Sequence, residues 1–191
     1  MTEKEPTGDY IETFTGKHFY SLDPSVEMVE LEDIAHALSN ICRFNGHTNV
    51  FYSVAEHSVH ASMLVPRKFA QEALLHDAAE AFLLDVPRPL KQFMCFAVDK
   101  EKGAYPYSWY ESKLLEVIFS RFGLKTSKNL PEIVKEVDNR ILATEYREFV
   151  NEKVPGELGR VKPYHEFSFG KFGPGEAKQV FLNRARELKL K

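Results

Sequence analysis

The sequence predicts an all-α fold, a single helical bundle with a short extended or hairpin segment near its N-terminus. Apolar residues recur three and four positions apart in several segments, which is the spacing of one helix face. No part of the chain alternates a strand pattern with a helix pattern, as a fold built from βαβ units would. With 191 residues, 43% of them apolar, the chain is long enough to bury the core of one domain.

The chain divides into three parts. We expect residues 1–12 to form a flexible N-terminus, residues 13–150 the main domain, and residues 151–191 a loop and a helix that packs on the same domain. The segment FTGKHFYSL, residues 14–22, places aromatic residues around a Thr-Gly turn, which indicates a hairpin or extended segment. We expect no other β structure.

The first half of the chain contains predicted helices over residues 31–41, 53–64 and 68–84. The first of these repeats apolar residues at helical spacing and has acidic residues in its first turn. Ser53 is a suitable N-cap for the second helix. Pro87 and Pro89 prevent the third helix from continuing, and a short apolar segment follows them.

The second half contains predicted helices over residues 106–123, 131–150 and 174–188. Proline suits the first turn of a helix, so Pro106 and Pro131 mark two of the starts. Gly123 can end the first of these helices. Residues 151–175 are rich in Gly, Pro and Lys, so we expect a loop there.

Composition excludes several classes of function. A formal net charge of −3 gives no support to a binder of nucleic-acid polymers or of membrane surfaces. No apolar run approaches the roughly 20 residues that cross a bilayer, and the N-terminus MTEKEPTGDYIE is acidic where a signal peptide would be basic. We therefore expect a cytoplasmic protein. Its two cysteines are far apart, so a bound metal would have nitrogen and oxygen ligands.

Polar residues interrupt the apolar stripes of several predicted helices, and they are the candidate metal ligands His57, His76, Asp77 and Asp138. Charged groups among apolar neighbours are expensive to bury unless a counterion such as a divalent cation neutralises them. Two histidines and two carboxylates suit Zn, Mn, Fe or Co. Taken alone, a residue such as His57 is more often a hydrogen-bonded core histidine, so spacing leaves both interpretations open.

The order H…HD…D, filled by these residues, resembles the HD-domain metal-dependent phosphohydrolases. The resemblance also includes Arg43-Phe44, Glu80 after the HD pair, and Asp85 within LDVPRPLK, and it extends over about residues 14–149. This combination is similar to bacterial 5′-deoxynucleotidases of the YfbR type, to prophage HD nucleotidases and to phage enzymes that hydrolyse deoxyadenosine triphosphate. Those deoxynucleotidases have Trp where this chain has Phe44, which lacks the indole N–H.

The resemblance implies a role for each of these residues. His57, His76, Asp77 and Asp138 would hold a divalent metal ion, Co, Mn, Zn, Fe or Mg. Catalysis would involve Glu80 and Asp85, whose separate roles the sequence leaves open. The expected substrate-binding residues are Arg43, Phe44, His47 and Lys91.

The expected reaction is hydrolysis of a deoxynucleoside 5′-monophosphate to deoxynucleoside and phosphate. One alternative is release of triphosphate from a deoxynucleoside triphosphate by attack at the same α-phosphorus, for which Arg88, Lys91, Lys17 and Lys68 could supply additional positive charge. A second alternative is a nucleotide-binding HD module without catalytic activity. Because related enzymes form homo-oligomers, we expect a dimer or a larger assembly.

Overall fold

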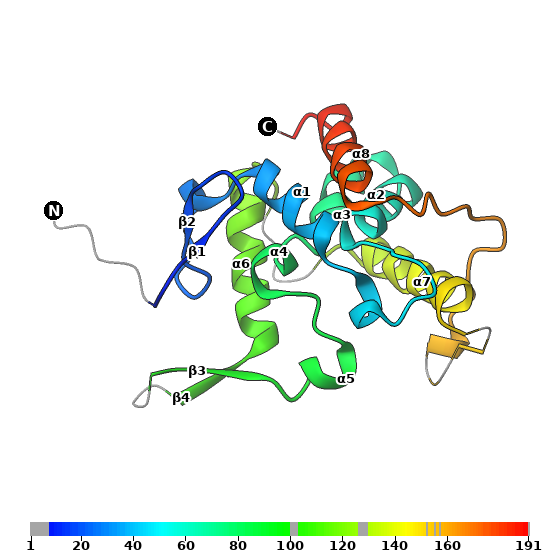
Figure 1. Ribbon diagram of the computed structural model, residues 1–191, viewed down its shortest axis with the longest axis horizontal. Coiled ribbons are helices and arrows are strands. Elements are labelled where there is room, and N and C mark those ends of the chain that lie inside the picture. Colours follow the sequence, from blue (N-terminus) through cyan, green and yellow to red (C-terminus); the bar gives the residue numbers. More distant parts are fainter. Residues whose placement is uncertain are drawn as a thin grey trace, which may run out of the picture.

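Helices make up most of the structure, so the prediction of an all-α fold is confirmed (Figure 1). The computed structural model describes residues 8–99, 103–125, 130–151, 153–154, 156 and 158–190. Its α-helices are α1 (Leu31–Asn40), α2 (Val54–Leu64), α3 (Ala70–Leu75), α4 (Glu80–Leu83), α5 (Arg88–Lys91), α6 (Tyr107–Arg121), α7 (Glu132–Phe149) and α8 (Pro174–Glu187). Short 3-10 turns cover Val26–Met28, Arg43–Gly46, Arg67–Phe69 and Leu158–Arg160.

Helix α2 is the centre of the bundle. Every residue from Val54 to Ser62 is buried, because α1, α3, α7 and α8 all pack against this helix. Its start agrees with the prediction, since the Ser53 side chain accepts a hydrogen bond from the Glu56 backbone N–H. A helix buried on all sides must satisfy its polar side chains inside the protein. The polar side chains of α2 are therefore candidates for the functional site.

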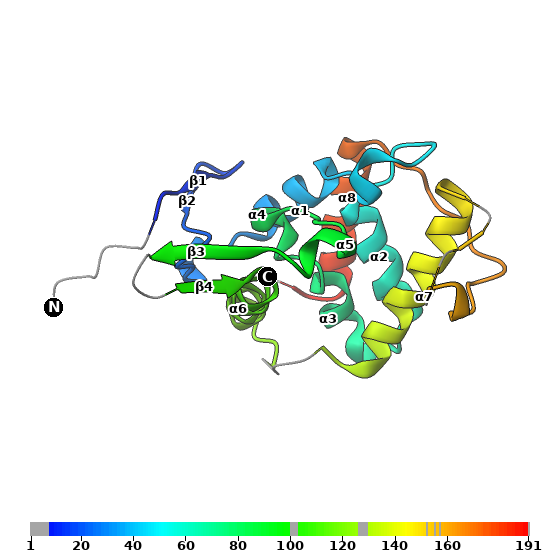
Figure 2. The same cartoon turned by 90° about the horizontal axis from the view of Figure 1, so that it is seen from below.

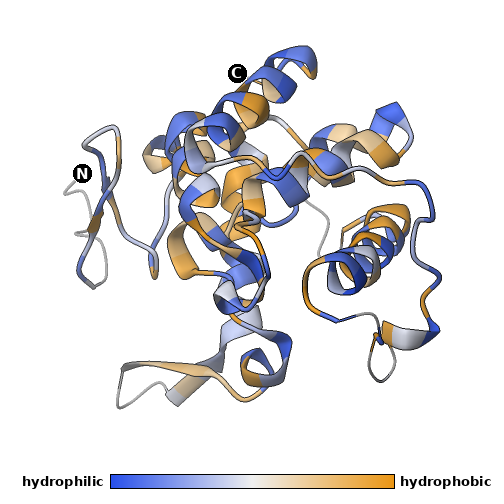
Figure 3. Cartoon of the chain, turned by 45° about the vertical axis from the view of Figure 1, so that its right-hand side comes forward, coloured by the Kyte–Doolittle hydropathy of each residue, from blue (hydrophilic) through white to orange (hydrophobic). Residues whose placement is uncertain are grey.

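The C-terminal helix α8 lies across α1 and α2 and completes the same core (Figures 1 and 2). Phe181 and Ala185 of α8 are fully buried in this core. The helices have hydrophobic and hydrophilic residues on different sides, as expected for amphipathic helices (Figure 3). In the part of the chain that the structure describes, no helix is both long enough and apolar enough to span a membrane.

The predicted N-terminal hairpin is present, but its first strand lies at residues 11–12, within the segment 1–12 that we expected to be flexible, of which residues 1–7 lie outside the described part of the chain. Strands β1 (Ile11–Glu12) and β2 (His18–Phe19) pair antiparallel, with Ile11 opposite Phe19. The tight turn between them includes Gly16, whose φ of 82° is a conformation that glycine adopts easily. Phe19 is fully buried and stacks on Phe82 of α4 at 3.6 Å between ring centroids, which fastens the hairpin to the bundle.

The prediction of no further β structure is wrong. Strands β3 (Cys95–Asp99) and β4 (Gly103–Pro106) form a second antiparallel hairpin, which extends away from the bundle beside α6 (Figure 2). Phe96 pairs with Tyr105 across the strands and also packs edge-on against Tyr110 of α6, at 5.0 Å between ring centroids. The strand therefore depends on a helix later in the chain, and such tertiary packing decides strand formation more than local preference does.

The single helix predicted over residues 68–84 is also wrong, because α3 ends at Leu75 and α4 begins only at Glu80. Between them the backbone tightens to hydrogen bonds three residues apart, such as Glu80 N–H to Asp77 O at 3.0 Å. The Ala73 carbonyl, near the end of α3, accepts a hydrogen bond from the His76 side chain at 2.7 Å. A side chain that binds the local backbone competes with the regular helical pattern.

The packing of α8 leads to a prediction about stability. Replacing Phe181 by Ala removes a fully buried ring from the core, so we expect the free energy of unfolding to fall by about 3–5 kcal/mol. Urea unfolding followed by circular dichroism measures this change. Phe93→Ala is the matched control, since its ring is 80% exposed, and it should change stability by less than about 0.5 kcal/mol. Equal stability of the two variants would contradict a shared core.

Candidate metal centre

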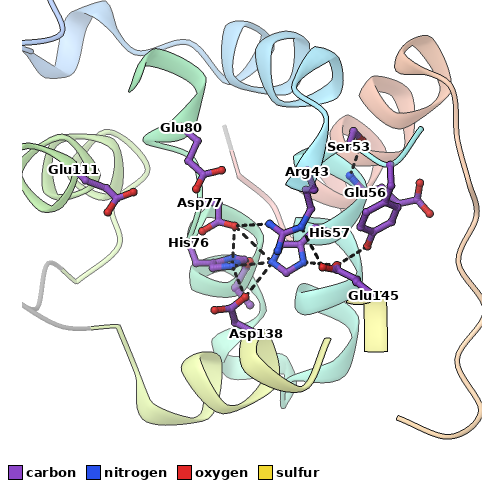
Figure 4. Close-up of polar contacts among 12 residues, drawn as sticks. Arg43, Ser53, Glu56, His57, His76, Asp77, Glu80, Glu111, Asp138 and Glu145 are labelled. Carbon is purple, nitrogen blue, oxygen red and sulfur yellow. Dashed lines mark hydrogen bonds and ion pairs between the residues drawn. The ribbon is translucent and has the colours of Figure 1, made fainter. Parts of the chain in front are cut away.

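Four polar side chains from three parts of the chain meet beneath a cavity in the structure (Figure 4). His57 comes from α2, His76 and Asp77 from the turn between α3 and α4, and Asp138 from α7. Nε2 of His57 lies 3.2 Å from Nε2 of His76 and 3.2 Å from Oδ1 of Asp138. Oδ2 of Asp77 lies 3.3 Å from Nε2 of His76 and 3.5 Å from Nε2 of His57. The structure thus brings all of the predicted ligands together.

Hydrogen bonds on the far sides of the two imidazole rings fix their orientation. Nδ1 of His57 donates to Oε1 of Glu145 at 2.6 Å, and Nδ1 of His76 donates to the Ala73 carbonyl at 2.7 Å. With the ring proton on Nδ1, each neutral ring directs the unprotonated Nε2 toward the other ring. Two such lone pairs repel each other unless a proton or a metal ion lies between them.

The buried Glu145 carboxylate is a site residue that the sequence interpretation missed. It is fully buried and accepts hydrogen bonds from Arg43 Nε at 3.1 Å, from the Tyr52 hydroxyl at 2.8 Å and from His57. Burial alone would raise the pKa of Glu145, but Arg43 and His57 outweigh burial and lower it to about 2. Glu145 lies two helical turns after Asp138 on the same face of α7, and this spacing was the available signal.

The charge balance of the cluster favours a cation at its centre. Burial opposes a charged His57 and so does Arg43, yet Glu145 and Asp138 raise the pKa of His57 to about 9. Burial also opposes a charged Asp138, but both histidines lower the pKa of this carboxyl well below its usual range. In the absence of metal, protons on the histidines balance the carboxylates.

The distances between the candidate ligand atoms fit a metal ion. Neighbouring ligand atoms 2.0–2.2 Å from one ion lie about 2.8–3.6 Å from each other in tetrahedral or octahedral arrangements. Among His57, His76 and Asp138 the corresponding distances run from 3.2 Å to 3.8 Å, the longest joining His76 Nε2 and Asp138 Oδ1 and slightly exceeding that range. His57, His76 and Asp138 therefore form a group that could hold a metal ion. Asp77 and Asp138 have side chains 22% and 26% exposed, so the group is open on one side.

A cavity of about 650 Å³ lies over this open side. Its lining includes the charged residues Arg43, Asp77, Glu80, Asp85, Arg88, Lys91 and Asp138. Apolar and aromatic residues complete the lining, namely Phe44, Val86, Pro87, Pro89, Leu142, Tyr146 and Leu158. Of the predicted substrate-binding residues, Arg43, Phe44 and Lys91 line the cavity. His47 is exposed and does not belong to this lining.

Glu80 and Asp85, the predicted catalytic carboxyls, both line the cavity. Burial, with the nearby charges of Asp77 and Asp85, raises the pKa of Glu80 well above its usual range. Its Oε2 atom is buried and has no hydrogen-bond partner among the described residues. Burial also raises the pKa of Asp85, although Arg43 acts in the opposite direction. Both carboxyls can therefore hold a proton closer to neutral pH than a solvated carboxyl does.

Comparison with known proteins shows where this chain belongs. The uncharacterized protein YfdR of Escherichia coli K12 is 39% identical over 189 residues, which cover 94% of this chain and 95% of YfdR. The chain belongs to the YfdR family. An uncharacterized Rhodobacter capsulatus protein is 36% identical to this YfdR-family chain over 119 residues, which cover 58% of the chain and 56% of that protein. No protein-family model matches the chain.

The perturbed pKa of His57 predicts how the stability of this YfdR-family chain depends on pH without metal. Because the pKa of about 9 in the folded protein lies above the ordinary histidine pKa of 6.5, His57 stabilises the fold fully below pH 6.5 and loses this contribution as pH rises through 9. The loss should be roughly 3 kcal/mol. Urea unfolding in excess chelator between pH 5.5 and pH 10 measures it. His57→Gln should flatten this slope, and a flat slope in the wild-type protein would contradict the assignment.

Proposed function

We propose that the protein is a metal-dependent hydrolase of the HD-domain superfamily that removes phosphate from deoxynucleoside 5′-monophosphates. The observation that carries the proposal is the arrangement of four converging metal-ligand candidates beside the cavity, with Arg43 and Lys91 in its lining. A volume of about 650 Å³ lies within the range of small-molecule sites. The order of the residues along the chain is the order that resembles the HD-domain enzymes.

His57, His76, Asp77 and Asp138 would hold the metal ion in this proposal. Their nitrogen and oxygen donors suit Co, Mn, Zn, Fe or Mg better than a soft metal that prefers sulfur. A bound divalent ion supplies Lewis acidity and lowers the pKa of a coordinated water toward neutrality. Glu145 stabilises the ligand set from the side away from the cluster, since its hydrogen bond with Nδ1 fixes the ring of His57.

Arg43 is the proposed phosphate-binding residue. Its Nε donates to Glu145, while NH1 lies 3.5 Å from Oδ2 of Asp77 and the side chain lines the cavity. The guanidinium is therefore anchored at one edge by Glu145, and its other edge is available toward the cavity. A planar guanidinium can donate to two phosphate oxygens at once, which gives it an advantage over a lysine at this place.

Glu80 and Asp85 are the proposed proton-transfer groups. Both carboxyls line the cavity beside the ligand cluster, and neither belongs to it. One would accept the proton of the attacking water and the other would donate to the leaving ester oxygen. The aromatic side chains in the lining, Phe44 and Tyr146, offer surfaces on which a base and a deoxyribose can pack.

The positions of the cations favour the monophosphate over the triphosphate. Of the residues considered for additional phosphates, Arg88 and Lys91 line the cavity. Lys17 instead pairs with Glu30 at 2.6 Å, and Lys68 lies over the Phe69 ring; neither belongs to the lining. Lys91 is itself paired with Glu111. Release of triphosphate by the same α-phosphorus chemistry remains the alternative, with Arg88 as its supporting residue.

A product assay tests the proposal. Purified protein with Co, Mn, Zn or Mg is incubated with each deoxynucleoside mono- and triphosphate, and phosphate and triphosphate are measured separately. We expect phosphate from the monophosphates, with at least about a thousandfold lower rate for His76→Ala or Asp77→Ala because the ligand set is then incomplete. Triphosphate release would favour the alternative reaction. No turnover by a folded protein with any metal would reject hydrolysis and favour a nucleotide-binding module.

Glu145→Gln tests the supporting role of Glu145 in metal binding. The amide cannot serve Arg43, Tyr52 and His57 as a carboxylate does, so we expect the metal affinity to fall about 10–100-fold. Calorimetric titration with Zn or Co measures this affinity directly. Glu148→Gln is the matched control, since its carboxylate is on the same helix with a side chain 48% exposed. Equal affinity in both variants would remove Glu145 from the metal site.

A further inference from the structure

Leu84 adopts a backbone conformation that is unfavourable for a residue with a side chain. Its φ of 74° and ψ of 155° fall in a region used almost only by glycine, so the conformation is strained for a leucine. The side chain is 66% exposed, so burial of the leucine does not compensate for this conformation. Leu84 directly precedes Asp85 and ends α4. Something else must hold the backbone at this point of the cavity wall.

Tyr107, the first residue of α6, supplies that contact. Its hydroxyl lies 2.9 Å from the carbonyl oxygens of both Leu83 and Leu84 and donates to them. These are carbonyls at the end of α4, which lack partners within the helix. The Tyr107 backbone N–H also donates to the Met94 carbonyl at 2.9 Å. One residue of α6 therefore fixes both ends of the segment 84–94, which includes Asp85 and Lys91.

Glu111 lies one helical turn after Tyr107, on the same face of α6. Its Oε1 accepts a hydrogen bond from Lys91 Nζ at 2.6 Å, and Figure 4 shows the carboxylate directed from α6 toward the site. Lys91 Nζ also lies 3.8 Å from Oε1 of Glu80, which is one of the two proposed proton-transfer groups. Lys91 thus stands between two carboxylates, and the contact with Glu111 is the shorter one.

We infer that Tyr107 and Glu111 are positioning residues for the proposed reaction: Tyr107 aims Asp85 by holding Leu84, and Glu111 keeps Lys91 on the cavity wall and away from Glu80. The predicted effect on catalysis rests on the proposed function, whereas the contacts themselves do not. Without Glu111, Glu80 is the remaining carboxylate that is within ion-pair distance of Lys91 in the described structure. A full ion pair there would occupy Glu80 and withdraw Lys91 from the substrate.

Hydrogen–deuterium exchange of the full-length protein without ligand tests the contacts. In Glu111→Gln, the backbone amides of residues 85–94 should exchange several-fold faster than in the wild-type protein, because the segment loses its ion pair with α6. Glu116→Gln is the matched control. It removes a similar ion pair, with Lys113 at 3.1 Å, from a more exposed part of the same helix, and should leave residues 85–94 unchanged. Identical exchange in both variants would overturn the inference.

Kinetics with a deoxynucleoside monophosphate test the consequence. We expect Glu111→Gln to raise KM about tenfold in the wild-type background and to have no further effect in Lys91→Met, because Glu111 acts through Lys91. Tyr107→Phe should lower kcat more than KM, since it acts through Asp85. Equal effects of Glu111→Gln in both backgrounds would indicate a purely structural role and overturn the inference.

The proposed function and the positioning role can be rejected independently of each other. If the wild-type protein hydrolyses no nucleotide, the proposed function fails, while the exchange of residues 85–94 still decides whether α6 holds this segment. If hydrolysis is found but Glu111→Gln leaves both exchange and KM unchanged, the function stands and the positioning role is rejected. Thermal unfolding of every variant confirms that the comparison is made between folded proteins.

Discussion

The structure depends most on the buried carboxylate of Glu145. A charge without solvent is tolerated only when it is paired and fully hydrogen-bonded. Glu145 meets this condition through Arg43, Tyr52 and His57, which come from the turn after α1, the segment before α2 and α2 itself. The two oxygens of the Glu145 carboxylate therefore join three parts of the chain to α7. Removal of the carboxylate would leave a buried guanidinium without its main partner, and the geometry of the candidate metal centre would be lost with it.

The same principle holds the C-terminal segment in place. Glu56, one residue before the candidate ligand His57, is also buried, and its carboxylate accepts the backbone N–H groups of Lys171 and Phe172 at 2.9 Å and 3.0 Å. Arg184 of α8 donates to the side chain and the carbonyl of Ser62 on α2. The central helix thus directs polar groups both toward the candidate site and toward the C-terminal segment. These two networks meet on α2, so packing of α8 and alignment of His57 depend on the same helix.

The sequence predicted the helical architecture and the metal-ligand candidates because both leave local signals. Apolar periodicity reports a buried helix face, and His57, His76, Asp77 and Asp138 are conspicuous because they interrupt such faces. Tertiary features leave weaker signals. Glu145 has the spacing of an inward-facing residue, but only the structure reveals its three donors. The β3–β4 hairpin likewise forms against aromatic residues of α6, which no property of residues 95–99 specifies.

Several features that local rules failed to predict lie around the cavity, although Lys171 and Lys189 also have positive φ outside its lining and the β3–β4 hairpin extends away from the bundle. Leu84 has φ of 74°, Phe44 has φ of 55°, and the backbone between α3 and α4 departs from the regular helical pattern. Each departure redirects a side chain or a segment that lines the cavity or belongs to the ligand cluster. Such conformations persist only where the surrounding contacts determine them, as the Tyr107 hydroxyl does at Leu84. Local strain that is compensated by buried polar contacts is more common at functional sites than elsewhere. The backbone strain at Phe44 and Leu84 is therefore consistent with the chemical role that we propose for this cavity.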